Sequence, residues 1–254
     1  MKLLLTADLH LSGNWFRWLL ENGRDYDLVC VAGDHLDLFS QTPKIAQARE
    51  AQYFFRRLAK VTRVALSSGN HDAVGSIIPS ARGPTYPWLV ELDEIRDLVS
   101  DGQTAIIGEL VVSTIPYYCD PQAKRVWLDR GRKIRQERKL KWLVLHHEPP
   151  VLRKSASGEE KEADTLLREY APDYWLSGHI HDLPYELGGK WIHLVGETLV
   201  FTPGQVPNAP WPNHVELDLA SGRLSWRTTR RCGELFAPVI EQHMVRYGMP
   251  PRDR

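Results

Sequence analysis

Short apolar runs, each followed directly by a cluster of polar residues, dominate the pattern of this chain. The runs are rich in Val, Leu and Ile and are bounded by Gly, Asp, Asn or Pro, which is typical of buried β-strands. They predict strands at residues 3–6, 28–31, 64–66, 142–145 and 174–176. Helix-like segments at residues 15–21 and 43–60 lie between the first strands, and this alternation predicts a largely parallel sheet.

The second half of the chain has a different texture, because three apolar segments there carry a turn signal. The segments are residues 104–115, 184–201 and 214–227, with turns at Gly108-Glu109, Gly196-Glu197 and Ser221-Gly222. Such pairs are typical of β-hairpins, so antiparallel strands are expected to join the parallel ones in a mixed sheet or two packed sheets. Residues 234–247 predict a terminal helix.

Length and composition indicate an ordinary globular protein. The 254 residues show no repeat or linker and predict one domain over residues 1–254. The formal net charge of +0 gives no global sign of a nucleic acid or membrane partner. The three cysteines are far apart and form no C-x-x-C motif, which favours a reducing compartment. Residues 1–7 are too short an apolar run for a signal peptide, and no stretch is long enough to cross a bilayer, so we expect a cytoplasmic location and no membrane partner.

Five polar clusters follow the predicted strands and hold most of the candidate chemistry. They are Asp8-Leu9-His10, Gly33-Asp34-His35-Leu36-Asp37, Gly69-Asn70-His71-Asp72, His146-His147-Glu148-Pro149-Pro150 and Gly178-His179-Ile180-His181. Because each follows a buried strand, all five are expected along one edge of a sheet. Carboxylate and imidazole ligands together suit Mn, Fe, Co, Ni or Zn, and the lack of thiolates argues against a structural zinc site. Two such ions about 3.5–4 Å apart form the clamp used for displacement at phosphorus.

The spacing within the clusters supports this interpretation. Asp8 and His10 are two residues apart, as are His179 and His181, and side chains at this spacing share one face of a strand. A Gly precedes Asp34, which lets the backbone turn tightly. A Gly-Asp or Gly-Asn pair alone is usually only a turn. All five clusters in order are a much more specific signal.

Taken together, the five clusters resemble the calcineurin-like metallophosphoesterase superfamily. The resemblance covers Asp-x-His, Gly-Asp-x-x-Asp, Gly-Asn-His-Asp, a His before Pro, and Gly-His-x-His, over residues 8–181. It extends to Phe201-Thr202-Pro203-Gly204, which is similar to a strand-then-Pro-Gly turn in these proteins. The resemblance implies an α/β fold, a four-layer α/β/β/α sandwich of two mixed sheets with a dinuclear metal site at the strand ends. It also implies phosphoester hydrolysis by a metal-bridging hydroxide.

The resemblance further implies a set of ligands for two divalent ions. Mn²⁺ is favoured, with Fe, Zn, Ni or Co as alternatives. The ligands implied for the first ion are Asp8, His10 and His181, and those for the second are Asn70, His179 and one histidine of the His146-His147 pair, with Asp34 bridging both. His147 fits the family spacing of His, any residue, then Pro, and His146 is the alternative.

Two further residues receive catalytic roles from the resemblance. His71 would face the phosphoryl group and protonate the leaving oxygen, and Asp37 would orient it. Leu38 and Phe39 stand where protein serine/threonine phosphatases of the superfamily usually carry Arg-Gly, which lowers the case for a phosphoprotein substrate. The substrate class stays open between a phosphodiester and a phosphomonoester, with a nucleotide or nucleic-acid-type substrate favoured.

Two alternatives from other classes of function remain. The first is a non-catalytic metal-binding scaffold of the same fold, although such a protein need not keep His71. The second is a nucleic-acid-binding module that uses the basic segment 124–141, whose simpler interpretation is the solvated face of a helix. The sequence leaves the oligomeric state open, and we expect structural roles for His35, His193, His214 and His243.

Overall fold

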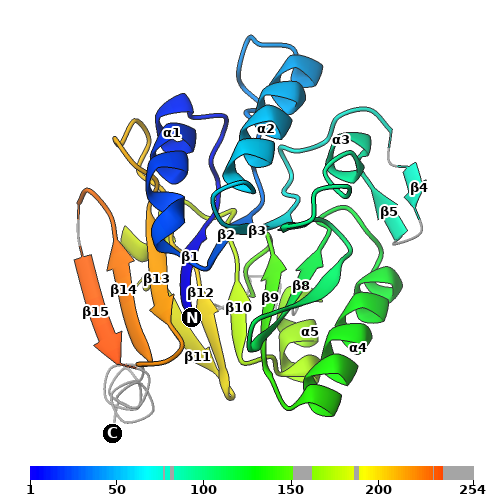
Figure 1. The fold of residues 1–254 in the computed structure, drawn as a ribbon, viewed down its shortest axis with the longest axis vertical. Helices are drawn as coiled ribbons and strands as arrows, with labels where there is room; N and C mark the ends of the chain where they lie inside the picture. Colours follow the sequence, from blue (N-terminus) through cyan, green and yellow to red (C-terminus); the bar gives the residue numbers. More distant parts are fainter. Residues whose placement is uncertain (77, 81–82, 151–161, 186–188, 231, 237–254) are drawn as a thin grey trace, which may run out of the picture.

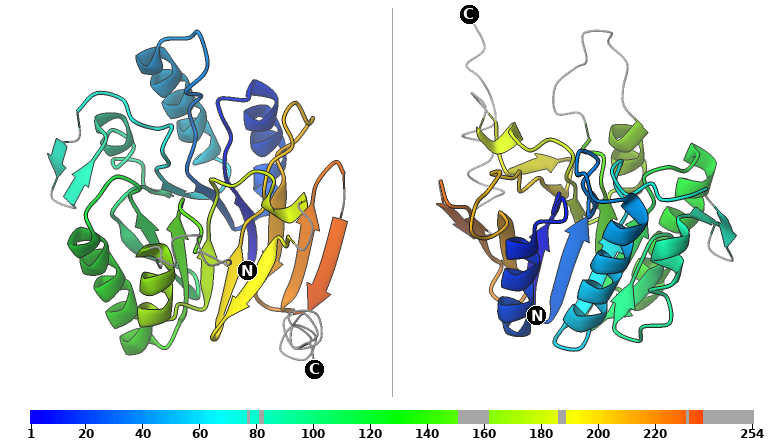
Figure 2. Two further views of the ribbon diagram at one scale, coloured as in Figure 1. Left: turned by 180° about the vertical axis from the view of Figure 1, so that it is seen from behind. Right: turned by 90° about the horizontal axis from the view of Figure 1, so that it is seen from above.

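Two mixed β-sheets pack face to face, and helices cover the outer side of each sheet (Figure 1; Figure 2). The computed structural model of the protein describes residues 1–76, 78–80, 83–150, 162–185, 189–230 and 232–236. The predicted four-layer α/β/β/α arrangement of two mixed sheets is therefore confirmed.

The first sheet has seven strands in the order β15-β14-β13-β1-β2-β3-β6. Its parallel strands are β1 (Lys2–Thr6), β2 (Leu28–Ala32), β3 (Arg63–Ser67) and β6 (Leu98–Val99). Its antiparallel strands are β13 (His214–Asp218), β14 (Arg223–Arg227) and β15 (Cys232–Phe236). The parallel half places the ends of β1, β2 and β3 next to one another.

The second sheet has six strands in the order β11-β12-β10-β9-β8-β7. The four central strands run parallel and are β8 (Leu110–Ile115), β9 (Lys141–His146), β10 (Tyr174–Leu176) and β12 (Thr198–Phe201). The antiparallel edge strands are β7 (Thr104–Ile107) and β11 (Ile192–Val195), each joined to its neighbour by a predicted hairpin turn.

Helices and short elements complete the layers. Against the first sheet lie α1 (Gly13–Asn22) and α2 (Lys44–Leu58), and against the second lie α4 (Pro121–Arg138) and α5 (Glu162–Tyr170). The short elements are α3 (Pro87–Val90), the 3-10 turns η1 (Gly23–Asp25) and η2 (Leu183–Tyr185), and a ribbon of β4 (Ile78–Ser80) and β5 (Gly83–Thr85). Among the described residues, no helix combines the length and apolar character that crossing a bilayer requires.

The apolar runs are continuous because the central strands are buried on both faces. Leu4 of β1 packs under the helices of the first sheet, whereas its neighbours Leu3 and Leu5 point into the space between the sheets. In the second sheet, Trp142 and Trp175 pack under α4 and α5. Side chains at successive strand positions thus fill three separate cores, which stack into the four layers.

Two predictions of local structure differ from the observed fold. The apolar residues of segment 43–60, Tyr53 included, predict a buried stripe, but the Tyr53 side chain is 63% exposed. Gln47 and Gln52 are buried there instead, with their amides bonded to Asp37 and to the Trp88 carbonyl of α3. The prediction of a terminal helix at residues 234–247 is wrong at its start, because Glu234 lies in β15 and pairs with Ser225 of β14. Residues 237–247 of that prediction lie outside the described part of the chain.

Candidate metal centre

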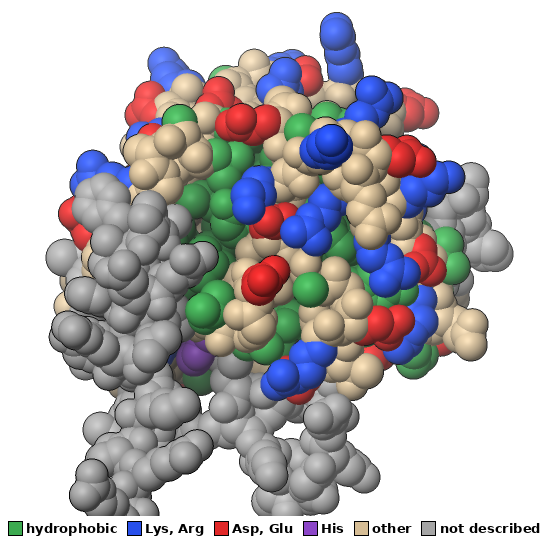
Figure 3. Space-filling view, turned by 90° about the horizontal axis from the view of Figure 1, so that it is seen from below, with side chains coloured by type: hydrophobic (Ala, Val, Ile, Leu, Met, Phe, Trp, Pro, Cys, Tyr) green, Lys and Arg blue, Asp and Glu red, His purple; other side chains and the backbone are tan. Residues whose placement is uncertain are grey.

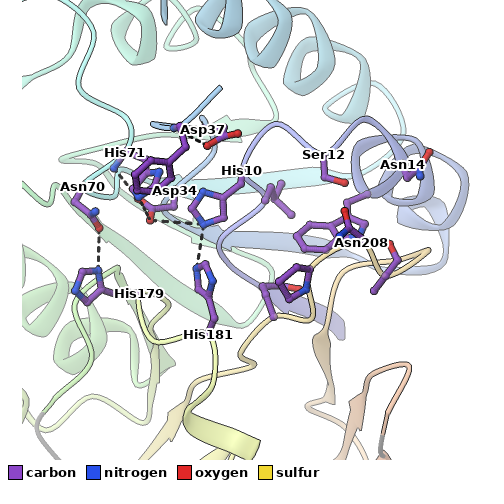
Figure 4. A pocket seen from close by; sticks show the side chains of 16 residues that line it. His10, Ser12, Asn14, Asp34, Asp37, Asn70, His71, His179, His181 and Asn208 are labelled. Atoms are coloured by element: carbon purple, nitrogen blue, oxygen red, sulfur yellow. Dashed lines mark hydrogen bonds and ion pairs between the residues drawn. The ribbon is translucent and has the colours of Figure 1, made fainter. Parts of the chain in front are cut away.

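All five polar clusters meet at the carboxyl ends of the central strands. Asp8, Asp34 and Asn70 follow the neighbouring strands β1, β2 and β3, and His147 and His179 follow β9 and β10 of the facing sheet. Parallel strands end at the same edge, so both sheets contribute side chains to one place (Figure 4).

Left-handed turns aim the side chains of the first sheet. Asp8, His10 and Asp34 have φ angles of 56°, 42° and 50°, in a region that non-glycine residues seldom adopt. The two loops hold each other, because the Asp8 N–H donates to the Gly33 carbonyl at 3.0 Å and the His10 N–H to the Asp34 carbonyl at 2.9 Å. Asp8 and His10 therefore converge through turns, and not through the strand alternation that we expected. Strained backbone of this kind is characteristic of functional sites.

Two glycines allow the sheets to approach closely at this edge. Gly33 has a φ of +82°, and a Cβ there would collide with the ring of His147. A Cβ on Gly178 would lie 2.7 Å from Asp8 Oδ2. Any larger residue at either position would separate the groups that the site brings together.

The first group of candidate ligands surrounds Asp8. His10 Nε2 and His181 Nε2 are 3.0 Å apart, and His181 Nε2 is 3.6 Å from Asp8 Oδ1. His10 Nε2 also lies 3.9 Å from Asp34 Oδ2. Asp8 is fully buried, and its Oδ1 accepts a hydrogen bond from the His179 N–H at 2.9 Å. Oxygen and nitrogen atoms at these separations are arranged as ligands of one ion.

The second group surrounds the Asn70 amide. Asn70 Oδ1 lies 3.0 Å from His147 Nε2 and 2.8 Å from His179 Nδ1. His147 Nε2 is in turn 3.3 Å from Asp34 Oδ2. The same Asp34 oxygen therefore borders both groups, which is the position that a bridging carboxylate requires.

Hydrogen bonding fixes the tautomer of His147. Its Nδ1 lies 2.7 Å from the Ala32 carbonyl, which can only accept, so Nδ1 carries a proton. Nε2 faces Asn70 Oδ1 and Asp34 Oδ2, and it offers a lone pair there only when His147 is neutral. Burial alone would lower the pKa of His147, but the hydrogen bond and charge of Asp34 raise it to about 9. Positive charge is therefore favoured next to Nε2 of His147, and a divalent ion bound there would supply it.

Further observations show that the residues fit divalent ions. Asp8 Oδ2 is buried and has no hydrogen-bond partner in the described part of the chain. Burial opposes ionisation of Asp8 and Asp34, yet hydrogen bonds and the neighbouring histidines keep the pKa of both carboxyl groups below the usual value. The grouped ligand atoms of Asp8, His10 and His181 lie within 4.8 Å of one another, as do those of Asp8, Asp34 and His147. Unpaired oxygens and ionised carboxylates without thiolates are a donor set for hard or borderline cations.

His71 lies beside the same carboxylate but presents a different face. Its Nε2 is 3.8 Å from Asp34 Oδ2, and its Nδ1 accepts a hydrogen bond from the Leu38 N–H at 3.1 Å. An amide N–H can only donate, so the proton of neutral His71 is on Nε2 and points into the pocket. Burial lowers the pKa of His71, partly offset by the charge of Asp34. Although its position among His10 and Asp34 would suit a ligand, His71 offers a proton there in place of a lone pair.

Asp37 lines the pocket but makes no direct hydrogen bond to His71 among the described residues. Its Oδ1 accepts from the Phe39 N–H at 2.9 Å, which closes a turn around Leu38. Gln47 bonds the N–H and carbonyl of Asp37 and fixes this turn to α2. The contact that we expected from the Asp37 carboxylate is thus made by the amide of the next residue.

Four described histidines, His35, His146, His193 and His214, lie away from this cluster. His146 is the last residue of β9, is fully buried, and its ring packs 5.9 Å from that of Trp175. His35 is also buried and donates to the Ser67 carbonyl at 2.9 Å. His193 and His214 bond to nearby backbone carbonyls in the same way, whereas His243 lies outside the described residues. Of the His146-His147 pair, only His147 reaches the ligands.

A cavity of about 630 Å³ opens over the site. Besides the predicted residues, its lining includes groups that no sequence pattern had indicated, namely Ser12, Asn14, Phe39, Gln205 and Asn208. They come from the start of α1, the turn after β2 and the loop after β12. The only sequence signal near them was the Pro203-Gly204 turn, which precedes Gln205.

Comparison with known proteins finds a matching family model and solved structures of similar fold. A family model described as calcineurin-like phosphoesterase matches residues 1–183. The structure of TT1561 of Thermus thermophilus aligns with a TM-score of 0.57 at 16% identity, covering 93% of this chain and 98% of that chain. A dimetal phosphatase from Danio rerio aligns with a TM-score of 0.57 at 12% identity, covering 93% and 99%. A purple acid phosphatase from yellow lupin (Lupinus luteus) seeds gives 0.55 at 13% identity, covering 94% of this chain and 52% of its own. No curated protein matches the chain.

Proposed function

Since the chain belongs to the calcineurin-like phosphoesterase family, we propose that it is a metal-dependent hydrolase of phosphate esters with two ions bound at the strand ends. The proposed ligands of the first ion are Asp8, His10 and His181, those of the second are Asn70, His147 and His179, and Asp34 bridges them. The observation that carries the proposal is the position of Asp34 Oδ2, which borders both groups of ligand atoms.

The chain's own residues supply the remaining chemistry. Two bound divalent ions would stabilise the charge on the phosphoryl oxygens and lower the pKa of an attacking water. His71 directs its Nε2–H toward the same region and would give this proton to the leaving oxygen. The Leu38 amide holds the His71 ring in that orientation, and Asp37 acts as a positioning residue because its carboxylate closes the turn that aims this amide.

We propose Mn²⁺ as the preferred metal and residues 1–254 as a single domain. Carboxylate, imidazole and amide ligands without thiolates support the choice of metal. The pairing of β1 with β13 and β14 with β15 supports the single domain, because both ends of the described chain share one sheet. A cytoplasmic location stays a prediction, which the unpaired state of the described cysteines Cys30 and Cys119 favours.

The substrate that we favour is a nucleotide-type ester and not a long nucleic acid. In the basic segment 124–141, Arg125 pairs with Glu169 at 2.7 Å, and Arg135 and Lys141 both pair with Asp173. Asp173 and Lys141 stand at the start of β10 and β9, at the opposite end of the strands from the metal ligands. The face in Figure 3 likewise carries basic and acidic side chains intermingled. These ion pairs favour a structural helix over a nucleic-acid-binding surface.

The test is hydrolysis of bis(p-nitrophenyl) phosphate and p-nitrophenyl phosphate by the full chain. We expect activity with Mn²⁺, loss of activity after chelation, and recovery when Mn²⁺ is restored. Asp34→Asn should abolish the Mn²⁺-dependent rate. The control is Asp97→Asn, at an exposed carboxylate that pairs with Arg63 and precedes β6, and it should keep the rate. A preference for the diester or the monoester decides between the two reaction classes. Two ions bound without hydrolysis of any phosphate ester would instead support the non-catalytic scaffold.

A further inference from the structure

The cavity continues past the candidate ligands into a side pocket. We use this name for the part lined by Ser12, Asn14 and Trp15 of the α1 region and by residues 207–209 of the loop after β12. Figure 4 shows Ser12, Asn14 and Asn208 beyond His10 and His181, on the side away from Asn70 and His179. A group attached to a phosphate at the metal site would therefore extend into this side pocket.

The walls of the side pocket are tied to each other and to the metal site. The Trp15 indole N–H donates to the Ala209 carbonyl at 2.7 Å and joins α1 to the loop. Gln205, at the start of the loop, donates its backbone N–H to the His181 carbonyl at 3.0 Å and its side-chain amide to the Ala7 carbonyl at 2.6 Å. The side pocket is thus pre-organised, and little ordering entropy remains to oppose binding there.

Three polar side chains of the side pocket, those of Ser12, Asn14 and Asn208, have no hydrogen-bond partner within the described part of the protein. Ser12 stands at the N-cap of α1, but its hydroxyl makes no cap hydrogen bond. The side-chain amides of Asn14 and Asn208 likewise bond to no other group in the described ranges. Asn208 is held in a left-handed turn with a φ of 61°. One hydroxyl and two amides together offer both donors and acceptors to a ligand.

The charge of the lining restricts what such a ligand can be. Of the described residues that line the cavity, none is a Lys or Arg, so a second phosphate group would find no cation on these walls. Phe39 also lines the cavity, with its ring 5.7 Å from that of His71 and 80% of the residue exposed. A planar group with hydrogen-bonding edges suits a cavity that offers both an exposed aromatic ring and side-chain amides.

We propose that the side pocket binds a neutral nucleoside whose single phosphate lies at the metal site. The inference rests on the proposed function and narrows its substrate class to nucleoside monophosphate esters. Ser12, Asn14 and Asn208 contact the nucleoside by hydrogen bonds, and Phe39 covers the face of the base. Nucleoside polyphosphates are excluded because their additional charges meet uncharged walls.

The test compares two diesters with the same leaving group. The probes are p-nitrophenyl thymidine 5′-phosphate and methyl p-nitrophenyl phosphate, which both release p-nitrophenolate and differ only in the group retained on phosphorus. We expect the Mn²⁺-loaded protein to show a kcat/KM at least tenfold higher for the thymidine ester. Binding of thymidine 5′-monophosphate and of methyl phosphate, measured by calorimetry, should show the same order without any turnover.

Variants separate the side pocket from the metal site. Asn14→Ala and Asn208→Ala should each lower kcat/KM for the thymidine ester about threefold to tenfold, the cost of one neutral hydrogen bond, and leave the methyl ester unchanged. Phe39→Ala should act in the same direction, and Phe39→Tyr should keep the preference. The control is Asn22→Ala, at the other end of α1, where the side-chain amide donates to the Trp18 carbonyl of the same helix.

The outcomes distinguish failure of the nucleoside site from failure of the proposed function. Hydrolysis of both esters with equal kcat/KM, unaffected by the Asn14 and Asn208 substitutions, would overturn the side pocket as a nucleoside site and leave the proposed function intact. A lack of hydrolysis of both esters and of p-nitrophenyl phosphate would overturn the proposed function. In that case, equal affinity for the two monophosphates would also overturn the nucleoside site, and a preference for the thymidine monophosphate would support it.

Discussion

His71 and His147 present opposite tautomers to one carboxylate. Their Nε2 atoms lie 3.8 and 3.3 Å from Asp34 Oδ2. The Leu38 amide donates to Nδ1 of His71, so the proton of neutral His71 is on Nε2. The Ala32 carbonyl accepts a hydrogen bond from Nδ1–H of His147, so Nε2 is the nitrogen that can offer a lone pair when an ion displaces its proton. Two backbone groups therefore determine which histidine can donate a proton and which can bind a metal.

We expect His71→Ala to slow hydrolysis of esters with poor leaving groups by about two to four orders of magnitude. The substitution removes a proton donor and no ligand, so two ions should remain bound. Rates should be measured for phenyl and p-nitrophenyl esters, with metal content determined on the same samples. The p-nitrophenyl ester should lose much less, because its leaving group needs no acid. An equal rate for wild type and variant on the phenyl ester would remove His71 from proton transfer.

The two adjacent histidines should respond differently to substitution. His147→Ala removes a lone pair at 3.0 Å from Asn70 Oδ1 and should lower the number of bound ions, as measured by calorimetric titration with Mn²⁺. His146→Ala, the matched control, removes a buried ring beside Trp175, so it should lower the free energy of unfolding by about 1–3 kcal/mol and keep both ions. Loss of an ion in His146→Ala with both retained in His147→Ala would reverse the assignment.

Asp34→Asn is expected to weaken the binding of both ions. The carboxylate oxygen borders both groups of ligand atoms, and the substitution removes one negative charge from each. Elemental analysis after dialysis against a weak chelator should find both sites depleted. Asp8→Asn is the matched comparison, because Asp8 belongs mainly to the first group and its loss should deplete one site. Depletion of a single site in Asp34→Asn would disprove the bridging position.

Asp37 offers a way to separate geometry from charge. The Asp37 carboxylate accepts from the Phe39 N–H, and an asparagine side chain can make the same bond. We therefore expect Asp37→Asn to keep kcat within about threefold and Asp37→Ala to lower it about tenfold or more, because the turn that aims the Leu38 amide is lost. The charge of Asp37 raises the pKa of His71, so the pH profile of kcat should shift in both variants, and only the size of kcat separates them. Equal losses in both variants would show that the charge of Asp37 is what matters.

The sequence predicted which residues meet at the candidate site because their positions follow a regular pattern. Residues that directly follow parallel strands share one edge, so Asp8, Asp34 and Asn70 could be brought together from hydrophobic pattern alone, before any contact was known. The choice between His146 and His147 depended on where β9 ends. The strand ends at His146, and only the next residue turns toward the site.

The histidine tautomers, the side pocket and the end of the chain could not be predicted, because they depend on contacts that residue types do not reveal. The Leu38 amide and the Ala32 carbonyl act through the backbone, which every residue carries. The side pocket joins Asn14 and Asn208, nearly two hundred positions apart, through a bond between Trp15 and a carbonyl. The terminal segment has apolar spacing that suits a helix, but pairing of β15 with β14 overrode that preference at Glu234.

The buried carboxyl group of Asp101 is expected to make stability depend on pH. Its Oδ1 accepts from the Ser68 N–H at 2.6 Å and its Oδ2 from the Thr85 hydroxyl at 3.5 Å. Burial raises the pKa of Asp101 from 3.8 to about 6, although the bonds to Ser68 oppose this. The folded chain thus holds a proton that the unfolded chain has released between these two values. Stability from this group is present at low pH and is lost as the pH rises through about 6.

A shift of this size corresponds to about 3 kcal/mol at most. Urea unfolding of the metal-free chain at pH 4 and pH 7 should therefore find Asp101→Asn gaining stability relative to wild type by up to about 3 kcal/mol at the higher pH. The difference between variant and wild type cancels the titration of other groups. Asp97→Asn, at an exposed ion pair with Arg63, should change stability by no more than about 0.5 kcal/mol at either pH. If the wild type and Asp101→Asn differ by the same free energy at both pH values, the pKa of Asp101 is the same in the folded and unfolded chain, and burial does not raise it.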